Sequence, residues 1–277
     1  MPAMELDASS QNIEDRVVDC VDQLPVLPVH ILELRQLTAN PDVNFKQIVP
    51  ILNKDPGLTA DLLKIVNSAR YGLRERIGTI DQAILFFGMR NFVEYIALTF
   101  AENALRKTFA KMPDISVYFD HATQISIQTR NIAAMAGIRH QDQETLTMAG
   151  LLHDVGRLVL QLITQTEGVR LLSDRPAADM EAIVLNEQER WGIDHCVVGS
   201  RICNKWRFPE LFESRIRWHH KPVHGDIFCR ESAIIYLAHI LTVPGITAEV
   251  IATALPLERM TELGLTPEGL ATLAPGD

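Results

Sequence analysis

Apolar residues recur every three or four positions along almost the whole chain, and this spacing places them on one face of an α-helix. Thr79-Ile80-Asp81-Gln82 has the form of a capping box, which marks the start of a helix. Another helix start is expected at Asp55-Pro56, where an N-cap residue precedes a first-turn proline. Runs that alternate apolar and polar residues between hairpin turns are hard to find. The pattern therefore predicts an all-α protein.

Prolines and polar turns divide the predicted helices into three blocks. The first hundred or so residues hold about five or six short helices. A second block begins near Pro113, and its helices are expected at about 114–136, 142–163, 178–190, 194–206 and 209–219. The last block, at about 226–277, adds further short amphipathic helices. We expect the junction between the first two blocks at Leu105–Lys111, just before Pro113.

Composition and charge narrow the class of protein. The 277 residues include 26 Lys+Arg and 35 Asp+Glu, and this net charge of −9 argues against non-specific binding of nucleic acid. The most apolar stretch, Ile84–Phe100, is interrupted by Arg90, Asn91 and Glu94, so no membrane span is expected. Met1–Glu14 is acidic and polar, unlike a signal peptide, which predicts a cytoplasmic location.

Cysteines and glycines do not form the common ligand-binding motifs. No Cys-x-x-Cys pair occurs, so we interpret the four cysteines as small core residues: Cys20, Cys196, Cys203 and Cys229. No G-x-x-x-x-G-K-[ST] or G-x-G-x-x-G phosphate loop is present either. The candidate chemistry must therefore lie in other residue types.

Histidine is that residue type. All nine histidines except His30 lie between residues 121 and 239. Several adjoin an acidic residue or another histidine: Asp120-His121, His153-Asp154, Asp194-His195 and His219-His220. Imidazole and carboxylate groups together suit Fe, Mn, Zn or Mg, and adjacent His and Asp can direct two ligands to one ion. The alternative is a hydrogen-bonded polar network between core helices, because a buried aspartate needs a partner of one kind or the other.

The run Ala149–Leu158, AGLLHDVGRL, resembles the core motif of the HD superfamily. In the metal-dependent phosphohydrolases of that superfamily, an earlier His, the His-Asp pair and a later Asp hold an ion that activates water. The resemblance implies that His121 and His153-Asp154 fill the first three positions. His239 stands where the later Asp is expected; it can ligate through a neutral ring nitrogen but carries no negative charge. Arg157 replaces a common lysine and is a candidate for binding phosphate or another anion.

Ordered motifs in both halves of the chain narrow this resemblance to the HDOD family, over about residues 18–223. They are Leu24–Pro28, Asp55–Ala60, Ile65–Gly72, Ile77–Ile84, Gly192–Gly199, Trp206, Pro209 and His219–Pro222. The resemblance implies a bacterial, all-helical regulatory module without an established catalytic activity. On the basis of this resemblance, we expect the chain to divide into four parts. They are an N-terminal segment at 1–17, an N-terminal helical subdomain at 18–112, an HD-like subdomain at 113–223 and a C-terminal helical extension at 224–277.

The same resemblance implies a second metal site that involves three more histidines. His195, His219 and His220 stand where related binuclear HD sites hold a second metal ion, and the alternative for each is packing and helix capping. The HD-GYP branch, which hydrolyses cyclic di-GMP, has a Gly-Tyr-Pro element after the paired histidines. This chain reads Lys221-Pro222-Val223-His224-Gly225 there, so that element is missing.

The expected function is that of a cytosolic bacterial signal-transduction protein that is not catalytic. It would act through signalling protein partners, or through a ligand or a divalent metal ion (Fe, Mn, Zn or Mg) in the HD-like pocket, whose occupancy would bias the arrangement of the two subdomains. No membrane or nucleic-acid partner is expected. The alternative is a metal-dependent phosphohydrolase or phosphodiesterase that tolerates His239 in place of the expected aspartate.

Overall fold

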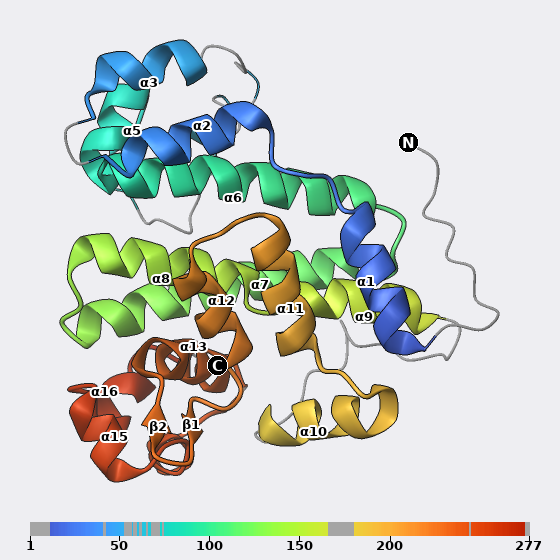
Figure 1. The fold of residues 1–277 in the computed structure, drawn as a ribbon. Coiled ribbons are helices and arrows are strands. Elements are labelled where there is room, and N and C mark those ends of the chain that lie inside the picture. Colours follow the sequence, from blue (N-terminus) through green and yellow to red (C-terminus); the bar gives the residue numbers. More distant parts are fainter. Residues whose placement is uncertain are drawn as a thin grey trace. The chain divides into compact units, whose positions relative to one another are not determined.

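The described part of the chain is helical, which confirms the predicted all-α class (Figure 1). The computed structural model describes residues 12–274 except 41–42, 53–56, 58–59, 61–62, 65, 68–72, 74, 166–179 and 244. Within that part, the strands are β1 (Val223–His224) and β2 (Ile227–Phe228), which form an antiparallel pair with Val223 opposite Phe228. The helix start expected at Asp55-Pro56 lies outside the described residues.

The chain forms two compact units, of which the smaller comprises residues 25–110. Its helices are α2 (Val29–Thr38), α3 (Phe45–Leu52), α5 (Ile80–Phe87) and α6 (Met89–Thr108). Helix α6 contacts α2 and α5, and it buries most of its residues from Asn91 to Leu105. An ion pair of 2.6 Å between Arg35 and Glu94 joins α2 to α6. Gly88 separates α5 from α6 with a φ of 75°, a backbone conformation that glycine adopts without strain.

The capping box predicted at Thr79 is present at the start of α5. Thr79 Oγ1 accepts the Gln82 N–H at 3.2 Å, and Gln82 Oε1 accepts the Thr79 N–H at 3.3 Å. Replacing Thr79 with alanine is therefore expected to lower the free energy of unfolding by about 1 kcal/mol. Urea unfolding followed by circular dichroism measures this change. Aspartate is also a good N-cap, so a Thr79→Asp variant as unstable as Thr79→Ala would contradict a capping role.

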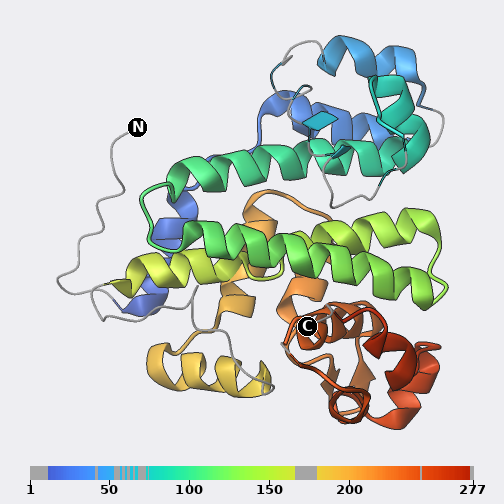
Figure 2. The same cartoon turned by 180° about the vertical axis from the view of Figure 1, so that it is seen from behind.

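The larger unit comprises residues 1–24 and 111–277. Its helices are α1 (Ile13–Gln23), α7 (Ile115–Met135), α8 (His140–Leu152), α9 (Val155–Ile163), α10 (Met180–Trp191), α11 (His195–Lys205), α12 (Glu210–Arg217), α13 (Arg230–Leu241), α14 (Ala248–Ala252), α15 (Leu257–Glu262) and α16 (Pro267–Ala271). The antiparallel pair α7–α8 is seen most clearly in Figure 2. Helix α13 contacts α7 and α8, so part of the expected C-terminal extension belongs to the core of this unit.

Helix α1 also belongs to the larger unit, although the sequence placed residues 18–112 together in one subdomain. Its apolar face buries Val17, Cys20 and Val21, and the helix contacts α9 and α11. At its end, Lys205 Nζ of α11 donates to the Asp22 carbonyl at 2.8 Å. The boundary between the units therefore falls after Leu24, where α1 ends, and again between residues 110 and 111.

Among the described residues, one helix and one bent helix pair are long and apolar enough to cross a membrane, by length and composition only. The first, His140–Ile163, is continuous through α8 and α9, and 89% of its most apolar window is buried inside the protein. The second is the pair α5 and α6, which is bent by 113°. Burial of this extent is typical of a core helix in a soluble protein. The His153-Asp154 pair lies within the first stretch, at the joint between α8 and α9.

Candidate metal centre

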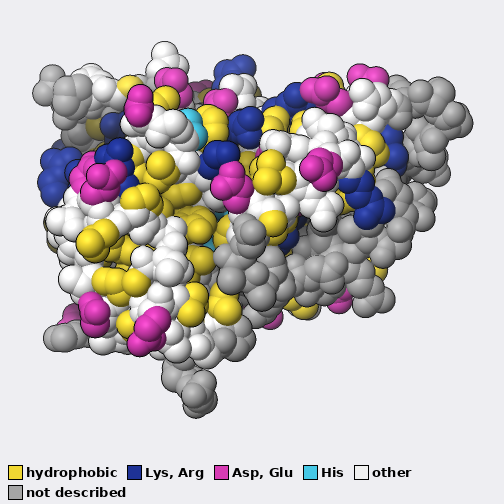
Figure 3. Space-filling view, turned by 90° about the horizontal axis from the view of Figure 1, so that it is seen from below, with side chains coloured by type: hydrophobic (Ala, Val, Ile, Leu, Met, Phe, Trp, Pro, Cys, Tyr) yellow, Lys and Arg dark blue, Asp and Glu magenta, His cyan; other side chains and the backbone are white. Residues whose placement is uncertain are grey.

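All seven predicted metal-site residues lie in the larger unit, and their side chains converge on one buried place. They come from the interior of α7, the α8–α9 joint, the first residue of α11, the turn after α12 and the interior of α13. The residues are His121, His153, Asp154, His195, His219, His220 and His239. His121 is 17% exposed and the others are buried. Little histidine surface accordingly shows on the face of the molecule in Figure 3.

The first set of ligand atoms combines three imidazoles with one carboxylate: His121, His153, Asp154 and His239. His239 Nε2 lies 2.9 Å from the Nε2 atoms of both His121 and His153. Asp154 Oδ2 lies 3.4 Å from His153 Nε2 and 3.7 Å from His121 Nε2. Four donor atoms therefore face one another at the distances expected around a single ion.

Hydrogen bonding fixes which atom of His153 faces this set. Its Nδ1 lies 2.7 Å from the Gly150 carbonyl, and because a carbonyl only accepts, Nδ1 carries the proton. In the neutral ring, Nε2 therefore presents a lone pair to His239. His239 Nε2 can hold one proton at most, so it cannot donate to both His121 and His153. A cation among the three rings would resolve this conflict, because each Nε2 would then donate its lone pair.

The second set lies on the other side of Asp154: His195, Cys196, His219 and His220. Asp154 Oδ1 lies 3.2 Å from His195 Nε2 and 3.5 Å from His219 Nε2. One carboxylate thus faces two histidine sets, with one oxygen toward each. Burial would raise the pKa of Asp154, but His153 and Arg157 outweigh it and hold that pKa well below its ordinary value.

Contacts outside the ligand sets orient the rings of the second set. Asp194 caps α11 by accepting the Val197 N–H at 2.8 Å, which places His195 at the first helical position. Glu187 Oε2 accepts from His195 Nδ1 at 2.6 Å and from the His195 backbone N–H at 2.8 Å. His219 Nδ1 donates to the Ile216 carbonyl at 2.7 Å. Both rings therefore turn Nε2 toward Asp154, as is typical of metal-ligating histidines.

The negative groups around the second set raise the pKa of two of its histidines. Burial would lower the pKa of His219, but the neighbouring Cys196 and Asp154 outweigh it and raise that pKa to about 9. Burial likewise opposes a rise in the pKa of His195, which Cys196 and Glu187 nevertheless raise well above its ordinary value. Both shifts favour protonation of these rings, and metal binding would compete with it because a ligand needs its lone pair.

Three buried ring nitrogens of the centre have no hydrogen-bond partner among the described residues: Nδ1 and Nε2 of His220 and Nδ1 of His239. Each buried unpaired polar group costs about 1–3 kcal/mol. Such atoms are rare in native structures unless a ligand, an ion or water satisfies them. The donor set therefore fits a divalent metal ion, which would accept lone pairs from these buried atoms.

Two residues of the centre were missed by the sequence analysis, which assigned Cys196 to the core and gave Glu187 no role. Arg157, the candidate anion-binding residue, lies with Nη1 3.3 Å from Asp154 Oδ2. The structure thus gives its guanidinium a carboxylate partner inside the protein. Binding of an external anion by Arg157 stays a prediction.

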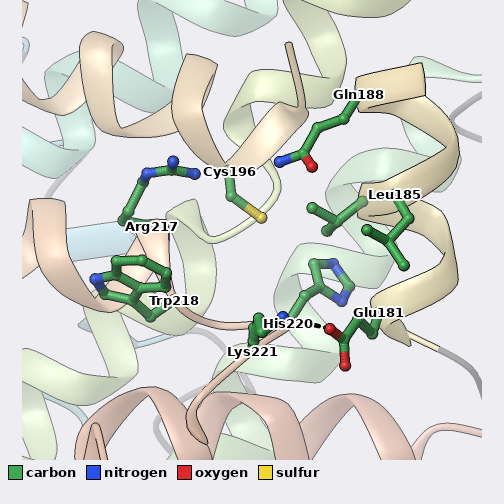
Figure 4. Close-up of a pocket in the computed structure, with 9 residues that line it drawn as sticks. Glu181, Leu185, Gln188, Cys196, Arg217, Trp218, His220 and Lys221 are labelled. Atoms are coloured by element: carbon green, nitrogen blue, oxygen red, sulfur yellow. Dashed lines mark hydrogen bonds and ion pairs between the residues drawn. The ribbon is translucent and has the colours of Figure 1, made fainter. Parts of the chain in front are cut away.

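A small pocket of about 110 Å³ reaches the second set (Figure 4). The residues that line it include Cys196 and His220 of the second set, together with Arg217, Trp218 and Lys221. Both cations have carboxylate partners: Arg217 lies 3.6 Å from Asp194, and Lys221 lies 2.5 Å from Glu181. Two residues of the second set therefore line this pocket.

Comparison with known proteins places this arrangement in a family. An uncharacterised protein of Treponema pallidum (strain Nichols) is 26% identical over 231 residues, which cover 80% of this chain and 42% of that protein. The chain thus spans less than half the length of this relative. The sequence profile of the HDOD domain matches residues 24–222.

Solved structures share the fold. A protein from Shewanella amazonensis with a provisional phosphohydrolase name is 21% identical, with a TM-score of 0.63 over 94% of this chain and 93% of the other. An HDOD domain protein of unknown function from Geobacter sulfurreducens is 18% identical, with a TM-score of 0.63 over 95% and 94% of the chains. A protein from Marinobacter aquaeolei with a provisional signal-transduction name is 19% identical, with a TM-score of 0.64 over 94% and 61%. Together with the profile match over most of its length, these findings show that the chain belongs to the HDOD domain family.

Proposed function

We propose that this chain is a metal-binding regulatory domain of a bacterial signalling protein, in which divalent ions bind at the buried centre around Asp154 and no substrate is turned over. The observation that carries the proposal is the convergence of buried lone pairs. Asp154 directs one oxygen to each histidine set, and the histidines turn unpartnered or competing ring nitrogens toward the same space. A hydrogen-bonded network alone would leave both ring nitrogens of His220 unsatisfied.

The residues of the two sets would hold the ions without rearrangement of the helices. A bound divalent ion would supply positive charge next to the ionised Asp154 and accept the lone pairs of the surrounding rings. Because the ligands come from α7, the α8–α9 joint, α11, the turn after α12 and α13, binding would cross-link most of the core of the larger unit. The metal-loaded and metal-free forms would then differ in stability, which is the property that a regulatory domain can transmit.

Two observations favour regulation over catalysis. The centre is almost fully buried, and the pocket that reaches it has a volume of about 110 Å³. Pockets for drug-sized ligands have volumes of about 300–1,000 Å³, so this pocket suits an ion or a few water molecules better than a nucleotide. The signal-transduction name of the Marinobacter protein agrees with a regulatory role.

Elemental analysis of protein purified without chelator tests the proposal. We expect near-stoichiometric Fe, Mn or Zn in the native protein and loss of most of it in His153→Ala, because His153 contributes a ligand of the first set. His140→Ala is the matched control: its ring is half exposed, and it belongs to neither set. Circular dichroism checks that both variants fold. Native protein that contains no metal and takes up none on dialysis against these ions would contradict the proposal.

Metal-dependent phosphodiester hydrolysis is the second candidate function. It is favoured by the carboxylate that faces two ligand sets, an arrangement found in two-metal hydrolases, and by the phosphohydrolase name of the Shewanella protein. The assay is hydrolysis of a chromogenic phosphodiester in the presence of Mn²⁺. Hydrolysis that disappears in His153→Ala would establish the enzyme, whereas metal-loaded protein without hydrolysis would favour the regulatory role.

A further inference from the structure

Cys196 brings a sulfur atom into the second set. Its side chain is 2% exposed, and its Sγ lies 3.6 Å from His195 Nε2. The ligand atoms of Cys196, His195, His219 and His220 all lie within 4.8 Å of one another. The other cysteines of the described chain are not part of either set: Cys20, Cys203 and Cys229. The thiol of Cys196 therefore has a position that the other three cysteines do not share.

The spacing of these atoms agrees with a tetrahedral site. With Zn–N distances of about 2.0–2.1 Å and a Zn–S distance of about 2.3 Å, neighbouring sulfur and nitrogen ligands lie about 3.6 Å apart. The distance from Cys196 Sγ to His195 Nε2 has this value. A thiol hydrogen bond to His195 would also explain this one contact, but it leaves both ring nitrogens of His220 without a partner.

His220 supplies the second, independent observation. Its side chain is only 4% exposed, and neither ring nitrogen has a hydrogen-bond partner among the described residues. The ring centroid of His220 lies 4.1 Å from that of His219 and 4.8 Å from that of His195, so the three rings crowd around the same space. Figure 4 shows His220 and the sulfur of Cys196 on the wall of one pocket. A buried, unpartnered imidazole beside a thiol indicates a ligand between them.

We propose that Cys196 is a metal ligand and that, with His195, His219 and His220, it makes the second set selective for a thiophilic, tetrahedrally coordinated ion such as Zn²⁺. This inference rests on the proposed metal-binding function and deepens it. Thiolate favours zinc and other soft or borderline ions, whereas magnesium and manganese prefer oxygen ligands. The first set has no sulfur, so the two sets differ in the metal they select.

Cobalt provides the test, because Co²⁺ adopts the same tetrahedral sites as Zn²⁺ and a cobalt–thiolate bond gives a near-ultraviolet charge-transfer band. We would titrate Co²⁺ into the full chain after removal of metal and record the absorption spectrum. We expect this band in the native protein, its loss in Cys196→Ser, and its retention in Cys203→Ala. Cys203 lies two turns further along the same helix and is equally buried. Equilibrium dialysis measures in parallel how much Co²⁺ each protein binds.

The outcomes separate this inference from the function on which it rests. Co²⁺ binding without a charge-transfer band, or a band that survives in Cys196→Ser, would overturn the role of Cys196 and leave the metal centre intact. A protein that binds no Co²⁺ or other ion would overturn both. If Cys196→Ser fails to fold, alkylation of the native protein replaces it: Zn²⁺ should protect Cys196 from iodoacetamide at least tenfold, as located by peptide mass spectrometry. Equal alkylation with and without Zn²⁺ would contradict the assignment.

Discussion

Replacing Asp154 with asparagine is expected to weaken metal binding in both ligand sets at once. The substitution keeps the shape of the side chain and removes its negative charge. Asp154 Oδ2 faces the first set, of which Asp154 is a member, and Oδ1 lies beside His195 and His219 of the second, so each set would lose a neighbouring negative charge. Loss of residues that only support metal ligands typically costs about 10–100-fold in affinity, so we expect a loss of at least about 100-fold for the first set, where Asp154 is a ligand, and of about 10–100-fold for the second. Elemental analysis and equilibrium dialysis with Zn²⁺ and Mn²⁺ measure it.

Two further variants show whether the loss of metal binding in Asp154→Asn comes from the position of Asp154 between the two sets. His239→Ala removes a ligand of the first set alone, and His220→Ala removes a ligand of the second alone. Each variant should lose the metal bound by its own set and keep the metal bound by the other set. If Asp154→Asn affected just one set, or if His220→Ala emptied both, the two sets would not share Asp154 in the way the geometry indicates.

The sequence predicted the helical class and the histidine set because both leave local signals. Helical periodicity and capping residues are visible within a few positions, as the capping box at Thr79 shows. The His153-Asp154 pair and its surroundings form a short motif, and the resemblance then indicated where the distant histidines should lie. The structure brings all of them together around Asp154, including His239, which stands in place of an expected aspartate.

The residues that the sequence did not reveal depend on contacts between distant helices. Glu187 lies on α10 and reaches His195 across a turn, so no motif marks it. Cys196 was interpreted as a core residue because no cysteine pair had metal-binding spacing, although its position next to His195 was a possible signal. The residues of α1 were divided between the expected N-terminal segment at 1–17 and the subdomain at 18–112, whereas the buried face of this helix contacts α9 and α11. Pairwise packing of this kind leaves no periodicity in the sequence.

Gly156, two residues after Asp154, is the position where the fold and the centre depend most directly on each other. A Cβ atom there would lie 2.0 Å from the His195 carbonyl oxygen and 2.7 Å from the Gly199 nitrogen. Both are backbone atoms of α11, so no side-chain rotation could relieve the clash. Glycine at this position therefore permits the close approach of α9 and α11 that brings His195 Nε2 to 3.2 Å from Asp154 Oδ1.

Replacing Gly156 with alanine is accordingly expected to lower the free energy of unfolding by about 3 kcal/mol or more, at the upper end of the range for overpacked cores. The helices would have to separate, and this movement would draw His195 away from Asp154 and weaken the second set more than the first. Urea unfolding and metal titration measure the two effects. Gly78→Ala is the matched control, since a Cβ there would meet Gln82 Oε1 at an ordinary 3.7 Å. A Gly156→Ala variant as stable as this control would show that α9 and α11 do not approach so closely.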